Sequence, residues 1–127
     1  MEYVSKQFFN GRALLIEDNI NMRAYMQDLL RHWGCQCDAA VSVDDALALA
    51  RANKPDFLIS DYRLNELLNG IEAIVTLREL LGSNIPAMLV TGDVTPEREA
   101  EARANNIHLL HKPLSVNELH RGLMMML

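Results

Sequence analysis

The stretch PDFLISDYRL, from Pro55 to Leu64, contains a short apolar run that ends at an acidic residue, Asp61. Residues Phe57 to Ser60 have the length and the character of a strand buried on both faces. An aspartate is also common where a strand gives way to a turn, so Asp61 taken alone could be a simple strand end. The pattern becomes informative because other apolar runs in the chain also end in charged or hydroxyl side chains.

Apolar runs suited to strands alternate along the chain with segments of helical periodicity. The expected strands cover residues 12–17, 35–40, 56–60, 85–90 and 107–111. The expected helices cover residues 19–33, 43–53, 71–81, 96–106 and 116–127, and the last one begins with a capping box of Ser115 and Glu118. Such alternation implies right-handed crossovers and a parallel sheet with helices on both faces. The sequence therefore predicts an α/β fold, a (βα)5 three-layer sandwich whose five-stranded sheet has the flavodoxin-like order 2-1-3-4-5.

Composition limits the functions that fit. Half of the 127 residues are hydrophobic, enough for the core of one domain, and 17 acidic against 12 basic residues argue against binding nucleic acid. No apolar run reaches the roughly 18 residues of a membrane span, so we expect no membrane contact by this domain. Cys35 and Cys37 match neither a CxxC motif nor a zinc site and are expected to be reduced thiols. We expect a cytoplasmic domain at residues 12–127, after a linker or N-terminal extension at residues 1–11.

Chemically active side chains are expected together at the carboxyl ends of the strands. Glu17 and Asp18 follow the first strand, Asp61 the third, Thr91 the fourth and Lys112 the fifth. In parallel α/β sheets the ligand site lies outside these ends, near the switch in strand order. Crowded carboxylates repel one another unless a hard cation lies between them, and Mg²⁺ binds both carboxylates and phosphate oxygens. The residues thus predict a Mg²⁺ site at which Asp61 accepts a phosphoryl group, with Lys112 and Thr91 offsetting negative charge.

Four segments carry a resemblance to a known family: LLIEDN, DFLISDYRL, MLVTGD and LLHKPLS, in this order. Together they resemble the response-regulator receiver domain of two-component signalling, over nearly the whole chain from about Arg12. MLVTGD and LHKPLS are most similar to receivers at the carboxyl end of hybrid sensor histidine kinases. The parent protein of such a domain would be a histidine kinase.

The resemblance implies a function and a set of site residues. Asp61 would be the phosphoacceptor for a histidine kinase or a phosphotransfer domain in a phosphorelay. Mg²⁺ would be bound by Asp18, Asp61 and the main-chain carbonyl of Arg63, while Glu17 would hold a metal-bound water.

The same resemblance implies that Thr91 and Lys112 contact the bound phosphoryl group. It also implies that the Lys112–Pro113 peptide bond is cis. A domain of this kind is not an enzyme beyond its own phosphoryl transfer and autodephosphorylation, and its output is a change of surface.

Some positions depart from the family pattern. Glu17 stands where a second aspartate is more frequent, and the loop YRLNELLN at residues 62–69 is one residue longer than usual and lacks the common proline. Leu109 stands where many members carry the tyrosine or phenylalanine that turns inward on phosphorylation.

A second class of protein uses related chemistry. Phosphohydrolases of the haloacid dehalogenase type also carry an aspartyl nucleophile on an α/β fold. They resemble one another in an Asp-x-Asp motif near the first strand, whereas this chain has Arg63 two places after Asp61 and carries the nucleophile on the third strand. The sequence favours the signalling module and keeps the phosphohydrolase as the alternative.

Two surface features carry further hypotheses. Arg63 and Asp93 each follow a site residue by two positions and could control the access of water to the site. The last helix ends in Met124, Met125, Met126 and Leu127, so it is apolar around most of its circumference. A core-facing side explains half of this pattern, and a partner surface, such as that of a homodimer, would explain the rest.

Overall fold

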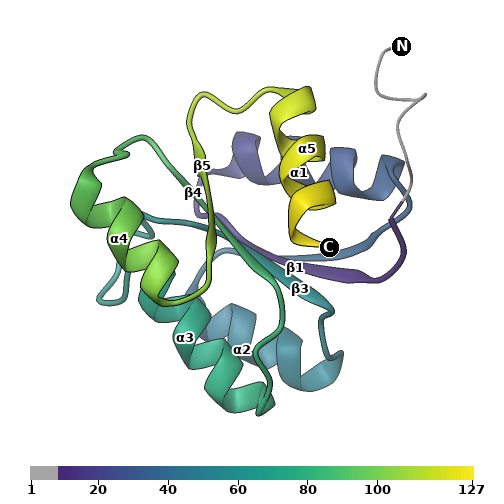
Figure 1. The fold of residues 1–127 in the computed structure, drawn as a ribbon. Helices are drawn as coiled ribbons and strands as arrows, with labels where there is room; N and C mark the ends of the chain where they lie inside the picture. Colours follow the sequence, from purple (N-terminus) through teal and green to yellow (C-terminus); the bar gives the residue numbers. More distant parts are fainter. Residues whose placement is uncertain (1–8) are drawn as a thin grey trace.

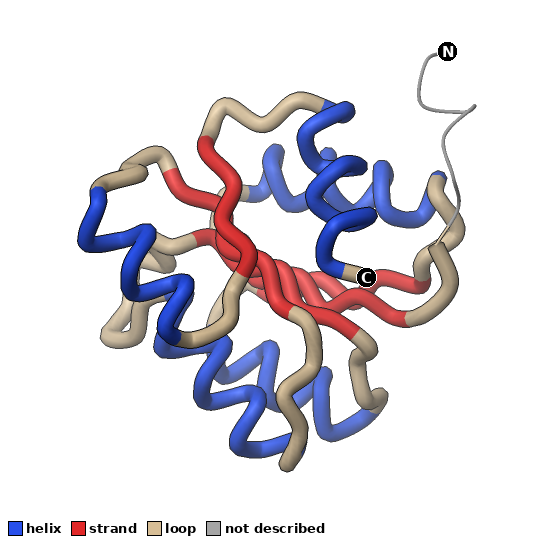
Figure 2. The backbone as a smooth tube through the Cα atoms, viewed as in Figure 1, coloured by secondary structure: helices blue, strands red, loops and turns tan. Residues whose placement is uncertain are grey.

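The computed structural model describes residues 9–127, in which one sheet is enclosed by helices (Figures 1 and 2). The strands are β1 (Arg12–Ile16), β2 (Gln36–Ala40), β3 (Phe57–Asp61), β4 (Ala87–Thr91) and β5 (His108–His111). The helices are α1 (Ile20–His32), α2 (Val43–Ala52), α3 (Gly70–Leu81), α4 (Pro96–Ala104) and α5 (Val116–Met126). Strands and helices alternate along the chain, as the sequence predicts.

The sheet has the predicted order β2-β1-β3-β4-β5, and every neighbouring pair of strands is parallel. The flavodoxin-like (βα)5 fold is therefore confirmed. β1 ends at Ile16, so Glu17 lies just beyond the sheet, whereas Asp61 and Thr91 are the last residues of their strands. Parallel pairing brings all of these strand ends to the same edge.

The helices form two layers, one on each face of the sheet (Figure 1). α1 and α5 cover one face, around a core that includes Leu30, Trp33 and Leu119. α2, α3 and α4 cover the other face, where Leu58 and Ile74 are fully buried. The central strands β3 and β4 are buried along their whole length, which explains why the sequence shows them as continuous apolar runs.

Capping interactions fix the helix starts. Ser115 Oγ accepts a hydrogen bond from Glu118 N, which is the N-cap half of the box expected there. The capping box with bonds in both directions lies instead at Asn69 and Glu72, at the start of α3. This box sets where α3 begins, and therefore how the loop after Asp61 ends.

The segment before β1 already contributes to the core. Phe9 is buried, its N–H donates to the Trp33 carbonyl oxygen at 2.8 Å, and its ring contacts those of Trp33 and His120. Residues 1–8, most of the expected linker, lie outside the described residues. Among residues 9–127, no helix is both long and apolar enough to cross a lipid bilayer.

The two cysteines are free thiols, as expected, and both are buried. Burial raises the pKa of Cys35 to about 11 and that of Cys37 to about 12. Because the thiolate is the reactive form, burial lowers the reactivity of both thiols at neutral pH.

The last helix is buried on one side only. Leu119 and Leu123 lie in the core, whereas Met124 is 51% exposed and Met125 is 71% exposed. The core therefore accounts for part of the apolar character of α5, and the exposed methionines form a separate surface.

Candidate functional site

Three carboxylates meet at the carboxyl edge of the sheet. Glu17 and Asp18 come from the segment after β1, and Asp61 ends the neighbouring strand β3. Each offers one carboxylate oxygen, and these oxygens lie within 4.8 Å of one another. They line an open cleft of about 540 Å³. The convergence expected from the sequence is thus present at the switch in strand order, between β1 and β3.

Lys112, which follows β5, reaches into the same cleft. Its Nζ lies 3.1 Å from Asp61 Oδ1 and 3.7 Å from Glu17 Oε1. The Lys112–Pro113 peptide bond is cis, as the resemblance implied. The lysine therefore supplies the positive charge nearest to the proposed phosphoacceptor in the described residues.

Burial controls the charge of the two innermost carboxyl groups. It raises the pKa of Glu17 from 4.5 to about 7; the Asn19 N–H bond opposes this shift and the nearby Asp61 adds to it. Burial also raises the pKa of Asp61, while Lys112 pulls it down through a hydrogen bond and its charge. Crowding of this kind is relieved by a bound cation.

Of the other two expected site residues, Arg63 lines the cleft and Thr91 does not. Thr91 is buried at the end of β4, and its Oγ1 accepts a hydrogen bond from Asp93 N at 3.1 Å. Arg63 lines the cleft, and its side chain forms an exposed ion pair with Asp93, with 2.6 Å between NH2 and Oδ2. The pairing of Arg63 with Asp93 matches the sequence hypothesis, although its effect on water stays a prediction.

The loop after Asp61 is closed at its base by a glycine. Gly70 N donates to the Tyr62 carbonyl oxygen at 2.8 Å. A Cβ atom at Gly70 would overlap with the main-chain carbonyl oxygen of Asp61. Only glycine permits this close approach, so α3 begins directly against the end of β3.

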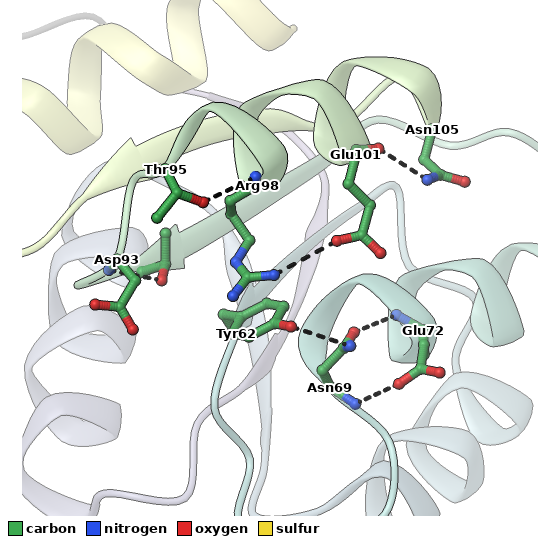
Figure 3. A network of polar contacts seen from close by, with 9 residues as sticks. Tyr62, Asn69, Glu72, Asp93, Thr95, Arg98, Glu101 and Asn105 are labelled. Atoms are coloured by element: carbon green, nitrogen blue, oxygen red, sulfur yellow. Dashed lines mark hydrogen bonds and ion pairs between the residues drawn. The ribbon is translucent and has the colours of Figure 1, made fainter.

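Tyr62 connects the site to α4 (Figure 3). The Arg98 guanidinium carbon lies 3.5 Å from the centroid of the Tyr62 ring, a cation–π geometry. The Tyr62 hydroxyl accepts a hydrogen bond from Asn69 Nδ2, and Arg98 pairs with Glu101 at 3.5 Å. The residue next to Asp61 is therefore held between the start of α3 and the first turn of α4.

Asn65 is a site residue that the sequence did not reveal. Its Nδ2 donates a hydrogen bond to Asp18 Oδ2 at 2.5 Å. The contact joins residues 47 positions apart in the chain, from a loop without periodicity. The only local signal in the sequence was an asparagine in a loop, and asparagine is equally common in turns that carry no site.

The donor set suits a small divalent cation. Carboxylate oxygens from Glu17, Asp18 and Asp61 are the hard ligands that Mg²⁺ prefers, and no thiol or imidazole takes part in this cluster. Asp61 is also the carboxylate nearest to Lys112. The lysine therefore adds a positive charge beside the same carboxylate cluster.

Comparison with known sequences agrees with this geometry. The family model described as "Response regulator receiver domain" matches residues 13–123. The transcriptional regulatory protein ZraR of Salmonella typhimurium is 33% identical over 113 residues, which cover 87% of this chain and 25% of ZraR. A response regulator receiver protein of Anaeromyxobacter is 32% identical over 106 residues, covering 83% of this chain and 44% of that protein. The chain thus spans less than half the length of these relatives.

Solved structures lead to the same family. The chemotaxis protein CheY4 of Vibrio cholerae superposes with a TM-score of 0.85 at 25% identity, covering 94% of this chain and 100% of that one. The family match leaves the alternative of a haloacid dehalogenase-type phosphohydrolase without support. The chain belongs to the response regulator receiver domain family.

Proposed function

We propose that Asp61 is the residue that accepts the phosphoryl group in this receiver domain. The observation that carries the proposal is the position of Asp61: it is shared by the carboxylate cluster and by Lys112, 3.1 Å away. Glu17 lies farther from the lysine, at 3.7 Å, and Asp18 accepts a hydrogen bond from Asn65. Of the three carboxylates, Asp61 lies closest to the compensating ammonium group.

The transfer exchanges one bond to phosphorus for another. The bond between phosphorus and the phosphohistidine nitrogen breaks, its electron pair stays on the imidazole, and an Asp61 carboxylate oxygen bonds to phosphorus. Lys112 and the Thr91 hydroxyl offset charge on the phosphoryl oxygens. Mg²⁺, when bound, supplies positive charge to the same oxygens; Asp18, Asp61 and the main-chain carbonyl of Arg63 would hold it, with Glu17 acting through a water.

The proposed phosphoryl donor is a histidine kinase or a phosphotransfer domain. Apolar side chains beside the cleft support a protein donor. Tyr25, which lines the cleft, is 42% exposed, and Ile20, the first residue of α1, is 69% exposed. Exposed apolar groups at the rim of a reactive site are suited to docking another protein. An origin in a hybrid sensor kinase stays a prediction, because the relatives named above are regulators.

A mass measurement tests the assignment of Asp61. The protein is incubated with Mg²⁺ and a small acyl-phosphate donor, and its intact mass is recorded. Wild type and the control Asp28→Asn, which changes an exposed carboxylate on α1, should each gain one phosphate. Asp61→Asn should gain none, because a neutral amide is a poor nucleophile. A gain in Asp61→Asn equal to that of wild type would refute the assignment.

We also propose that the exposed end of α5 contacts a second copy of the chain. Met124, Met125 and Leu127 are at least half exposed on one helix end, close to a groove of about 600 Å³ that Met125 and Met126 line with β5 and α4. Light scattering should show a concentration-dependent dimer that Met125→Lys weakens. A monomeric mass at all concentrations, with and without phosphorylation, would exclude this contact.

A further inference from the structure

We infer that Asn65 is a positioning residue for the divalent cation, because its side-chain amide orients the carboxylate of Asp18. The inference rests on the proposed function, since it concerns the same cation site. Its starting observation is the 2.5 Å hydrogen bond from Asn65 Nδ2 to Asp18 Oδ2. Both residues line the cleft, Asn65 from the loop after β3 and Asp18 from the segment after β1.

The residues on either side of Asn65 are anchored. Leu64 is 4% exposed and packs into the core beneath α2 and α3. The Glu66 carboxylate accepts a hydrogen bond from Val43 N, at the first turn of α2, at 3.2 Å. Asn65 is thus held between two fixed neighbours, and its side chain is presented to Asp18 by a defined piece of main chain.

The backbone conformation of Asn65 favours this residue type. Its φ is +54°, in the left-handed region that costs most side chains about 1 kcal/mol and that asparagine tolerates better. Asparagine also brings an N–H donor without a charge. A lysine or arginine here would add a positive charge that competes with the cation, and an aspartate would add a fourth carboxylate.

The chemistry of the pair fixes the direction of the bond. An ionised carboxylate only accepts hydrogen bonds, so the amide nitrogen of Asn65 must face Asp18. The amide thus holds Oδ2 of a carboxylate that also offers an oxygen to the cluster with Glu17 and Asp61. Hydrogen bonds that orient ligating groups in this way typically change metal affinity by about 10- to 100-fold when removed.

The chain offers a matched control for the test. Asn106 has the same φ of +54° and is also exposed, but it lies at the opposite end of the sheet, before β5. Asn65→Gly and Asn106→Gly each remove one asparagine side chain while keeping a residue that accepts the left-handed conformation. Any difference between the variants therefore reports the contact with Asp18.

The experiment titrates Mg²⁺ into wild type and both variants by isothermal calorimetry, without any phosphoryl donor. Asn65→Gly should bind Mg²⁺ about 10-fold more weakly than wild type, and Asn106→Gly should match wild type. The rise in the melting temperature at a fixed Mg²⁺ concentration should shrink in Asn65→Gly alone. Without Mg²⁺, the two variants should have the same melting temperature, and each cooperative transition shows that the variant is folded.

The outcomes separate this inference from the proposed function. If wild type binds Mg²⁺ and Asn65→Gly binds it equally well or more tightly, the positioning role is overturned while the cation site stands. If wild type binds no Mg²⁺, both the cation site and the role of Asn65 are overturned. Phosphorylation of Asp61, measured separately by mass, then decides whether the phosphoacceptor assignment survives.

Discussion

Lys112 Nζ lies 3.1 Å from Asp61 Oδ1, so the proposed phosphoacceptor is in contact with an ammonium group before any phosphoryl group arrives. The side chain of Lys112 is 28% exposed, and it spans from β5 across to β3. The contact has two opposing effects. It offsets charge on Asp61, and it places a positive charge beside the proposed cation site.

Lys112→Met should separate these two effects. Phosphorylation of Asp61 by an acyl-phosphate donor should slow strongly, because the charge that stabilises the transferring oxygens is gone. Mg²⁺ should bind at least as tightly as in wild type, because a repelling charge is removed. Intact mass against time and calorimetry measure the two quantities. Lys54→Met, at an exposed lysine in the loop before β3, at the opposite edge of the sheet, serves as the control and should change neither. Equal phosphorylation rates in Lys112→Met and wild type would show that the lysine is dispensable.

The raised pKa of Glu17 leads to a prediction of how the free energy of unfolding depends on pH in the absence of Mg²⁺. Its pKa is raised from 4.5 to about 7, so the unfolded chain releases this proton at lower pH than the folded protein does. The contribution of Glu17 to the free energy of unfolding is therefore fully present below pH 4.5, and it is lost as the pH rises through about 7. The free energy of unfolding should fall over this window by on the order of 1 to 3 kcal/mol.

Urea unfolding in the presence of a chelator, at several pH values, measures this slope. Glu17→Gln should show a shallower slope, and the part that remains comes from Asp61, whose pKa is also raised by burial. Saturating Mg²⁺ should oppose the slope, because the cation binds the deprotonated carboxylates. Equal slopes in wild type and Glu17→Gln would show that Glu17 has an ordinary pKa.

The ion pair of Arg63 and Asp93 should affect the lifetime of the phosphoryl group and not stability. Both side chains are largely exposed, so the pair contributes little to folding. Arg63→Ala or Asp93→Ala should open the rim and speed hydrolysis of the acyl phosphate severalfold. Loss of the phosphorylated mass after removal of the donor measures this rate. An unchanged rate in both variants would mean that the pair is only a solvated surface contact.

Substitution of Arg78, which lies away from the site, should lower the stability of the fold. This buried arginine of α3 donates to the carbonyl oxygens of Ile85, Asn105 and Asn106 at 3.0, 2.6 and 3.0 Å. Arg78→Met would leave these acceptors without the guanidinium and should lower the free energy of unfolding by about 2 to 4 kcal/mol. Arg103→Met, at an exposed position on α4, should change it little. Urea unfolding of the two variants provides the comparison.

The sequence was sufficient for the fold because its signals are local and repeated. Apolar runs such as Phe57–Ser60 and the spacing of residues in each helix give the alternation, and chirality then limits the topology. The convergence of Glu17, Asp18, Asp61 and Lys112 followed from the topology alone, since parallel strands end at one edge.

Contacts made by loop side chains could not be predicted from the sequence. The bond from Asn65 to Asp18 and the stacking of Arg98 on Tyr62 depend on the path of residues 62–69, which no periodic pattern encodes. The capping box at Asn69 and Glu72 was missed for a different reason. Its Asn-x-x-Glu spacing is visible in the sequence, but asparagine before a glycine reads first as a turn.

The hydrogen bond between Gly70 and Tyr62 separates the length of the intervening loop from the geometry of the strand end. Residues 63–69 form a loop whose two ends are joined by this hydrogen bond. Insertions or deletions in the loop should therefore change the rim of the cleft without displacing the carboxylate of Asp61. Substitutions in this loop should therefore be able to change the affinity for the cation and the lifetime of the acyl phosphate, provided that Gly70 is kept.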